Sequence, residues 1–312
     1  MISIGILTFN SPKTLKSSLE SYKISGILDY TDDIKCLIQP SQLQNEEIRL
    51  CKEYKIKYIL ENTNTMMAGA IKKLVRAAKY ELFLFLEADF RSCKSKTVNN
   101  KILDFAASKL QSKQLDVVRL RNLKNPGHPI HWSLQKKDGI NYNNNSELYL
   151  CTHYLKNPHI VYANFIKKIN NSPILYEINS KNCVYTNNPN LTSRSFYEKN
   201  ILPFAIDGKH LEPEIFHYWN NANFKIGISS GIFTHVRIDG HEGKKCYCCP
   251  EEMGGFSNNI NCVCCTEPYK PRSFDPNIDI SNSLDDVLDE EKLNKIYNNL
   301  QFKYFSNSNG AE

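Results

Sequence analysis

Residues 81–90 read ELFLFLEADF, in which five consecutive apolar residues end abruptly at two carboxylates, Glu87 and Asp89. An uninterrupted apolar run rich in Phe and Leu is typical of a strand that is covered on both faces, as in the centre of a parallel sheet. The carboxylates then stand at the carboxyl end of the strand, where open α/β sheets bind their ligands. We therefore expect a metal or phosphate site at Asp89, although the same residues could simply begin a polar turn.

The segments before this run alternate between strand and helix patterns. Ser11 is a good N-cap for the first helix, with Pro12 preset for its first turn. Alternation of this kind predicts a parallel sheet with right-handed crossovers. The strands are expected at 2–9, within 33–42, at 56–60 and at 82–86, with helices from 12, at 44–55 and at about 66–78.

Regularity weakens after Asp89. A Pro-, Gly- and Asn-rich loop is expected at 124–147, and long loops of this kind are usually functional or mobile. The remaining expectations are a helix at 101–114, a strand at 115–123, a helix at 210–221, a strand pair within 224–240 and an amphipathic helix at 285–300.

Composition limits the possible functions. The 312 residues carry a net charge of +6 that is spread along the chain without a long basic block, which argues against a nucleic-acid partner and fits a small anionic ligand. No stretch approaches the roughly 18 apolar residues of a membrane span, and the apolar N-terminus is too short for a signal sequence. We expect a soluble, unprocessed, cytoplasmic protein that is large enough for an enzyme.

Four segments together resemble a known family: ILTFN at 6–10, NTNTMMAGAIKKLVRAA at 62–78, LFLEADF at 84–90 and SSGIFTH at 229–235. They are similar to the nucleotide-sugar-dependent glycosyltransferases of the GT-A fold, particularly the family 2 type. The resemblance implies a Rossmann-like α/β domain over residues 1–240, with a mixed, mainly parallel sheet flanked by helices. Residues 1–92 would form the nucleotide-binding half, and residues 93–240 the acceptor half.

The resemblance also implies a divalent metal site. Asp89 would be a ligand, His235 would complete the metal shell, and Glu87 would touch ribose or a metal-bound water. Independently of the family, a divalent cation stabilises the charge that develops on a departing diphosphate. Oxygen ligands suit Mg²⁺ or Mn²⁺, and one imidazole favours Mn²⁺. Ala88 stands where many relatives carry a second acid.

Inversion at the anomeric carbon requires a base that can reach the acceptor hydroxyl. The family places an acidic residue at a helix start, and the segment HLEPEIFHYW at 210–219 supplies Glu212 and Glu214. Two positions apart on a helix, they point in different directions and cannot share one role. We favour Glu212 by its place in the motif; alternatively, both could merely complement the helix dipole.

Donor-binding candidates follow from the same resemblance, and each could equally serve as a loop or capping residue. Asn187 and Asn188, in the TNNP segment at 186–189, are expected beside the sugar, and Trp132 and Trp219 could stack on sugar faces. The nucleotide side comprises Thr8, Phe9, Asn10, Gln39, Asn62, Asn64, Gly69 and Lys72.

Six of the eleven cysteines lie within residues 246–265. Thiolates at this density in a cytosolic chain indicate a tetrahedral Zn²⁺ site, for which the two Cys-X-X-Cys pairs are the expected ligands. Disulfides are the alternative and would require an oxidising compartment. We expect a Cys-rich clip at 241–270, followed by a C-terminal helix and tail at 271–312; the predicted zinc ligands are Cys246, Cys249, Cys262 and Cys265.

The sequence therefore predicts a metal-dependent inverting glycosyltransferase that moves a sugar from a UDP- or GDP-sugar to a hydroxyl of a glycan or protein. One alternative is a sugar nucleotidyltransferase, but residues 8–18 lack the Gly-rich loop that such an enzyme would normally carry. The other is a non-catalytic, zinc-clipped binding module, for which Ala88 is the best support.

Overall fold

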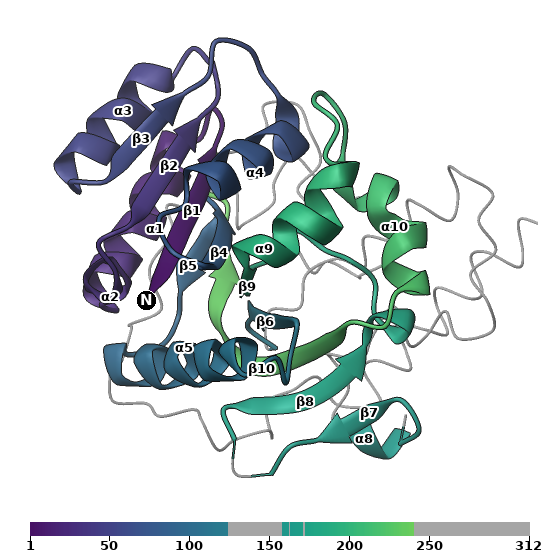
Figure 1. The fold of residues 1–312 in the computed structure, drawn as a ribbon. Helices are drawn as coiled ribbons and strands as arrows, with labels where there is room; N and C mark the ends of the chain where they lie inside the picture. The colour runs from purple at the N-terminus through teal and green to yellow at the C-terminus, as the bar shows by residue number, and fades with distance from the viewer. Residues whose placement is uncertain (124–157, 162, 171, 240–312) are drawn as a thin grey trace, which may run out of the picture.

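The computed structural model describes residues 1–123, 158–161, 163–170 and 172–239 (Figure 1). The cysteine cluster, Trp132 and the predicted C-terminal helix lie outside these residues. Within them, no helix is both long enough and apolar enough to cross a membrane.

Residues 1–87 form the predicted alternation of strands and helices. Its four strands run parallel in the order β3-β2-β1-β4. The strands are β1 (Ile2–Thr8), β2 (Ile34–Ile38), β3 (Lys57–Leu60) and β4 (Leu82–Glu87), and the helices are α1 (Pro12–Ile24), α2 (Ile27–Tyr30), α3 (Gln44–Glu53) and α4 (Met66–Ala77).

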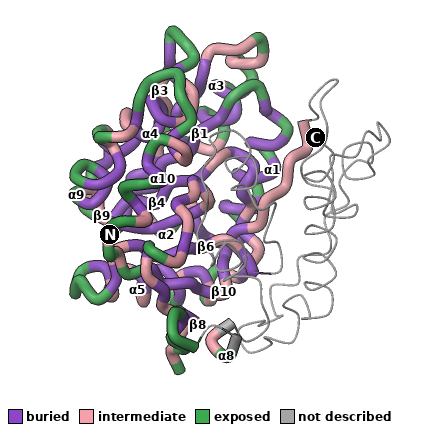
Figure 2. The backbone as a smooth tube through the Cα atoms, turned by 90° about the vertical axis from the view of Figure 1, so that its right-hand side faces the viewer, coloured by how far each residue is buried: buried purple, intermediate pink, exposed green. Residues whose placement is uncertain are grey.

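Strand β4 confirms the interpretation of its sequence. All five apolar residues are buried, and they alternate between two clusters: Leu82, Leu84 and Leu86 belong to one, Phe83 and Phe85 to the other. Because successive side chains of a strand point to opposite faces, both faces of β4 are covered. Figure 2 shows the same concentration of buried residues along the strands.

The described residues from 90 to 235 extend the same sheet with strands of both directions. Its elements are β5 (Phe90–Ser92), α5 (Lys96–Gln111), β6 (Val117–Arg121), α8 (Pro158–Val161), β7 (Ile166–Lys168), β8 (Ile174–Asn179), η1 (Ser180–Asn182), β9 (Asn190–Ser193), α9 (Arg194–Phe196), η2 (Tyr197–Ile201), η3 (Leu202–Phe204), α10 (Leu211–Asn221) and β10 (Lys225–His235).

In the described part of the chain, the sheet has ten strands in the order β3-β2-β1-β4-β9-β6-β10-β8-β7, with β5 paired to β10. Strand β9 is antiparallel to both of its neighbours, so β4 and β6 run in the same direction. Among these ten described strands, only β5, β8 and β9 run against the direction of β1. The sheet is therefore mixed and mainly parallel in strand direction, which fits the expected fold.

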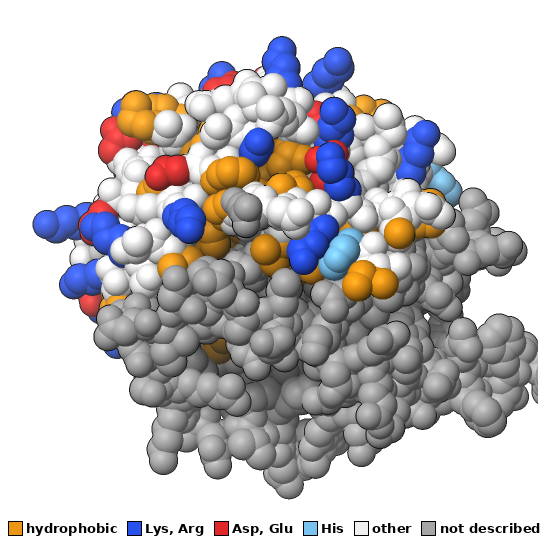
Figure 3. All heavy atoms as spheres, turned by 90° about the horizontal axis from the view of Figure 1, so that it is seen from below, with side chains coloured by type: hydrophobic (Ala, Val, Ile, Leu, Met, Phe, Trp, Pro, Cys, Tyr) orange, Lys and Arg blue, Asp and Glu red, His pale blue; other side chains and the backbone are white. Residues whose placement is uncertain are grey.

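Helices cover both faces of the sheet. One buried cluster joins the sheet to α1, α3 and α5, and the other joins it to α4, α10 and the helical segment at 194–204 (Figure 1). On the face seen from below, Lys and Arg side chains are dispersed among uncharged and acidic ones (Figure 3), in keeping with the absence of a basic block in the sequence.

Two local predictions need correction at helix starts. Ser11 and Pro12 take the N-cap and first-turn positions of α1, but the Ser11 side chain makes no capping bond; Asp239 Oδ2 accepts from the Thr14 N–H at 2.7 Å instead. The helix predicted at 101–114 begins at Lys96, because Ser95 caps it by accepting from the Val98 N–H.

The strand pair predicted within 224–240 is wrong, since one irregular strand, β10, occupies 225–235. Its register against β6 shifts between Ile228 and Phe233. The Ser229 hydroxyl donates to the Arg119 carbonyl at 2.9 Å and accepts from the Gly231 N–H at 3.1 Å. Gly231 has φ +81°, a conformation that favours glycine, so the glycine marks a bulge rather than a hairpin turn.

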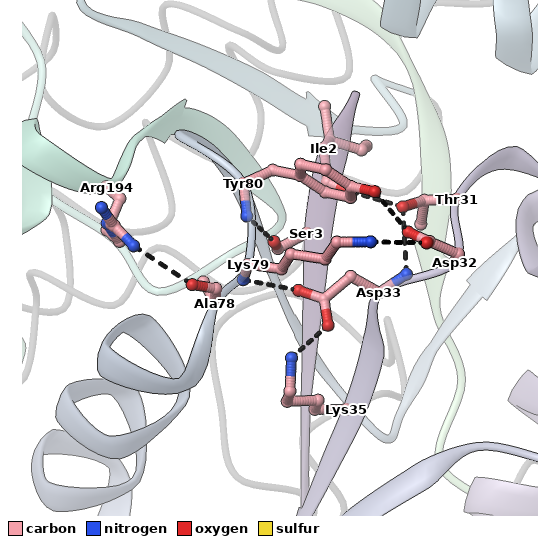
Figure 4. Close-up of polar contacts among 10 residues, drawn as sticks. All are labelled: Ile2, Ser3, Thr31, Asp32, Asp33, Lys35, Ala78, Lys79, Tyr80 and Arg194. Atoms are coloured by element: carbon pink, nitrogen blue, oxygen red, sulfur yellow. Dashed lines mark hydrogen bonds and ion pairs between the residues drawn. The ribbon is translucent and has the colours of Figure 1, made fainter.

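The amino-terminal edge of the sheet is tied together around Asp33 (Figure 4). This buried carboxylate pairs with Lys35 and accepts from the Lys79 N–H at 2.8 Å. The Ser3 hydroxyl accepts from the Tyr80 N–H at 2.8 Å. The network joins β1, β2 and the α4–β4 connection at the edge opposite to the candidate site.

Candidate active site

Asp89 and His235 meet at the carboxyl end of β4. Asp89 lies in the turn between β4 and β5 and is 9% exposed, whereas His235 ends β10, where it pairs with Phe90. His235 Nε2 lies 3.0 Å from Asp89 Oδ2, and the Val236 N–H donates to the Asp89 carbonyl at 2.7 Å. The structure thus brings together the two residues for which the sequence analysis predicted a role as metal ligands.

The charge state of this pair follows from its neighbours. Burial raises the pKa of Asp89, but the hydrogen bond and charge of His235, together with Arg237, outweigh burial and hold the pKa below its usual value. Glu87 behaves in the opposite way: burial, then Asp89 and Glu212, raise its pKa well above the usual value against the opposing charge of Arg237 and Arg121. Of the two carboxylates, Asp89 is therefore the better candidate for an anionic metal ligand.

The donor set fits a divalent metal that is shared with a substrate. In the described residues, no group of three or more His, Cys, Asp or Glu side chains is arranged to hold an ion. The buried Asp89 Oδ1 has no hydrogen-bond partner in that part of the chain, and leaving it unsatisfied is costly. One carboxylate and one imidazole, completed by water and phosphate oxygens, form a site of the kind that Mg²⁺ or Mn²⁺ uses with nucleotides.

The two candidate bases have different environments. Glu212 is partly buried in the first turn of α10, and its Oε1 accepts from the Asn187 N–H at 2.9 Å. Burial raises the pKa of Glu212 above the usual value. Glu214 is turned outward and pairs with Lys209 at 3.1 Å. Glu212 is thus the one that lies against the TNNP segment.

The TNNP segment is a compact polar turn beside Glu212. Asn188 Nδ2 donates to Thr186 Oγ1 at 2.7 Å, and Asn188 Oδ1 accepts from Arg121 Nη1 at 2.6 Å. Asn187 is buried, and its Oδ1 has no partner within the described residues. Trp219 is a core residue whose Nε1 donates to the Cys183 carbonyl at 2.6 Å, so it presents no face to a sugar.

The loop after β1 rests on a residue that the sequence analysis missed. Glu47, on α3, is fully buried; its Oε1 accepts from the Thr8 hydroxyl at 2.6 Å and from the Ser11 N–H at 3.0 Å. Burial raises the pKa of Glu47. Phe9 is 45% exposed at this loop, and Asn10 has φ +51°. Glu47 therefore holds both ends of the loop, at Thr8 and at Ser11.

The other predicted donor residues make contacts within the chain. Gln39 Nε2 donates to the Met66 carbonyl at 3.0 Å, and its Oε1 accepts from the Thr65 N–H at 3.2 Å. Asn64 Oδ1 accepts from the Met66 N–H at 2.8 Å, whereas Asn62 is exposed.

The helix that follows this loop adds two more of the predicted donor residues. A Cβ at Gly69 would lie 2.5 Å from Thr65 Cβ, so glycine is needed there for packing. Lys72 pairs with Asp207 at 3.5 Å. These contacts order the β3–α4 loop and helix, and a role of the same residues in nucleotide binding stays a prediction.

Arg121 and Arg237, which act electrostatically on the carboxylates, were also missed. Arg121 follows Arg119 at strand spacing in VVRLR, and two arginines on one face of a buried strand were a usable signal. Arg237 and the helix-capping Asp239 carry no such signal, because their roles depend on where the chain runs after β10.

A scan against protein-family models found no match, and a search of curated proteins also found none. Among solved structures, the chain is similar to S. aureus TarS 1–349, at 16% identity and a TM-score of 0.44 over 75% of this chain. It spans 60% of that TarS chain.

The chain is also similar to glucosyl-3-phosphoglycerate synthase from Mycobacterium tuberculosis. The complex of that enzyme with Mn²⁺, UDP and glucosyl-3-phosphoglycerate matches at 13% identity and a TM-score of 0.43, over 76% of this chain and 72% of that one. Its complex with Mn²⁺, UDP-glucose and phosphoglyceric acid matches at 14% identity and a TM-score of 0.41, with the same coverage. Likeness at this level assigns no residue, ligand or reaction to the present chain.

Proposed function

We propose that the chain is a metal-dependent inverting glycosyltransferase that moves a sugar from a UDP- or GDP-sugar to an acceptor hydroxyl of a glycan or protein. The observation that carries the proposal is the Asp89–His235 pair at the carboxyl end of β4, with its 3.0 Å contact and an Asp89 Oδ1 that has no hydrogen-bond partner among the described residues. A partly buried base candidate, Glu212, influences Glu87 electrostatically. A ligand pair and a base at one end of a sheet suit the transfer of a group from a diphosphate.

The roles follow from the chemistry of each side chain. Asp89 and His235 would hold the divalent ion, which when bound would supply Lewis-acid stabilisation to the leaving diphosphate. Glu212, as a carboxylate, would accept the proton of the acceptor hydroxyl while that oxygen attacks the anomeric carbon from the side opposite to the diphosphate. The loop at 8–11, held by Glu47, would receive the nucleoside.

A direct test measures donor use by the purified chain. UDP- and GDP-sugars are supplied with and without Mn²⁺ or Mg²⁺, and release of the nucleoside diphosphate and transfer of the sugar are followed. We expect metal-dependent release from one of the two nucleotide classes, and thermal stabilisation by the matching nucleoside diphosphate with the metal. Use of a nucleoside triphosphate with release of pyrophosphate would instead identify a nucleotidyltransferase, and binding without turnover a non-catalytic module.

A further inference from the structure

An uninterrupted series of contacts leads away from the Asp89–His235 pair. The His235 ring packs edge-on against Phe90, with ring centroids 5.3 Å apart. The guanidinium carbon of Arg121 lies over the same Phe90 ring, 5.5 Å from its centroid, in the range of a cation–π interaction. Phe90 is buried and contacts both the imidazole and the guanidinium.

The series continues from Arg121 to Glu212. Arg121 Nη1 donates to Asn188 Oδ1 at 2.6 Å. Thr186 Oγ1 accepts twice from Asn188, from Nδ2 at 2.7 Å and from the backbone N–H at 3.2 Å. The same turn contacts Glu212 directly, because the N–H of Asn187, which lies between Thr186 and Asn188, donates to Glu212 Oε1 at 2.9 Å.

We propose that Arg121 is a positioning residue that holds Glu212 in register with the Asp89–His235 pair through Asn188 and the turn at 186–188. The inference rests on the proposed function, because it concerns how the base of that reaction is oriented. A carboxylate on a flexible Glu side chain gains little as a base unless its direction is fixed, and small misplacements are costly. The guanidinium of Arg121 suits this role, because its carbon lies over the Phe90 ring while its Nη1 donates to Asn188.

The orientation of Asn188 follows from its partners. Its Oδ1 must face the guanidinium, which only donates, and its Nδ2 must face Thr186 Oγ1. Its backbone carbonyl accepts from Asn190 Nδ2 at 2.9 Å, which anchors the turn to β9. The Asn188 side chain is therefore held by Arg121 of β6 and its backbone by Asn190 of β9, while α10 contributes Glu212.

The test compares Arg121→Ala and Arg121→Lys with a matched control, Arg194→Ala, which removes an arginine at the opposite edge of the sheet. In steady-state assays we expect Arg121→Ala to lower kcat by about 10- to 100-fold, the cost of a misplaced group, while KM for the donor stays within about threefold. Arg121→Lys should recover less than half of this loss on a logarithmic scale, because an ammonium cannot stack and donate at once. Arg194→Ala should retain wild-type kcat.

Two outcomes overturn the proposal. Arg121→Ala could weaken Mn²⁺-dependent binding of UDP or GDP, measured by calorimetry, with kcat unchanged; Arg121 would then bind the diphosphate. Alternatively, Arg121→Lys could restore full activity, which would reduce the role to charge alone.

A double-substitution cycle tests the link without turnover. If Arg121 acts through Asn188, the melting temperature of Arg121→Ala/Asn188→Ala should fall little further than that of the more damaging single variant, whereas additive losses exclude the link. This cycle remains informative if the wild-type protein transfers no sugar. In that case the proposed function is wrong, and the cycle still shows whether Arg121 and Asn188 interact.

Discussion

Asp89 and His235, which are 146 positions apart in the chain, lie with Oδ2 and Nε2 3.0 Å from each other. Three parts of the sheet create this contact: β4 ends just before Asp89, β5 pairs with the end of β10, and the bulge in β10 resets its register before His235. The contact therefore depends on the topology of the sheet as well as on the two side chains.

Asp89→Asn tests the metal assignment with an isosteric change. Because the amide carries no negative charge, we expect the enhancement of UDP or GDP affinity by Mn²⁺ to fall by at least about tenfold and turnover to be lost. Isothermal titration with and without Mn²⁺ measures the enhancement. Asp104→Asn, at an exposed residue bonded to Tyr30, is the control and should bind like wild type. An Asp89→Asn protein with full Mn²⁺ enhancement would remove Asp89 from the metal shell.

Glu212→Gln and Glu214→Gln form a matched pair on one helix turn. We expect Glu212→Gln to lower kcat by about 10² to 10⁴, the usual contribution of a positioned base, with donor affinity nearly unchanged. Glu214→Gln breaks only a partly exposed ion pair with Lys209 and should leave kcat near wild type. Steady-state kinetics and donor titrations distinguish the two variants, and the reverse pattern would exchange their roles.

The pH dependence of kcat/KM should report the ionisation of the proposed base, Glu212. Burial raises the pKa of Glu212, and only the ionised form accepts a proton, so activity should rise with pH through a value above that of an ordinary Glu. The Thr186 hydroxyl bond lowers this pKa, so Thr186→Val should move the acid limb further upward. Profiles of both proteins from about pH 4 to about pH 8 provide the measurement. An acid limb that Thr186→Val leaves in place contradicts this assignment.

The sequence was informative where one residue pattern has one physical solution. The run at 82–86 indicated a strand covered on both faces, and the carboxylate after it was expected at the carboxyl end of that strand, where open α/β sheets bind ligands. It was not informative where distant chain segments complete a local feature. Ser11 has the chemistry of a cap, but Asp239 makes the bond; Glu47 lies on an ordinary helix and becomes important only because Thr8 sits above it.

Asp33→Asn should destabilise the fold without touching the candidate site. Burial raises the pKa of Asp33, but bonds from Lys35, Ser3 and the Lys79 N–H outweigh burial and lower it overall. Replacing a buried, hydrogen-bonded carboxylate should cost about 1–3 kcal/mol of unfolding free energy near neutral pH.

The same carboxylate gives a pH signature. When a carboxyl group has a lower pKa in the folded than in the unfolded state, its charge stabilises the fold. This stabilisation is fully present above the pKa of the unfolded state and is lost as the pH falls through the pKa of the folded state. The difference in unfolding free energy between the wild type and Asp33→Asn, measured by urea unfolding, should therefore become smaller below about pH 4. Asp32→Asn, at an exposed neighbour, should show little effect at any pH. A gap that is constant with pH would mean that Asp33 contributes through shape rather than charge.

Gly231→Ala tests whether the bulge in β10 constrains the site. Gly231 and Gly208 both have positive φ, +81° and +79°, so alanine is strained at either position. A Cβ at Gly231 would also lie 2.1 Å from the Arg121 carbonyl oxygen, whereas a Cβ at Gly208 would have nothing within 4 Å. Gly208→Ala should therefore cost about 1–2 kcal/mol, and Gly231→Ala clearly more, because the β6 backbone must move. Urea unfolding of the two variants measures the difference.

If Gly231→Ala does not fold, Ser229→Ala examines the same bulge more gently. It removes the hydroxyl that bonds to the Arg119 carbonyl and the Gly231 N–H, at a cost of about 1–2 kcal/mol. Because His235 follows the bulge on the same strand, we expect Ser229→Ala also to reduce the Mn²⁺ enhancement of nucleotide affinity, although residue 229 is itself no ligand. If the Gly231→Ala protein is as stable as the Gly208→Ala protein, the bulge accommodates a Cβ without moving β6. If the Ser229→Ala protein keeps full Mn²⁺ enhancement, His235 is positioned independently of the bulge.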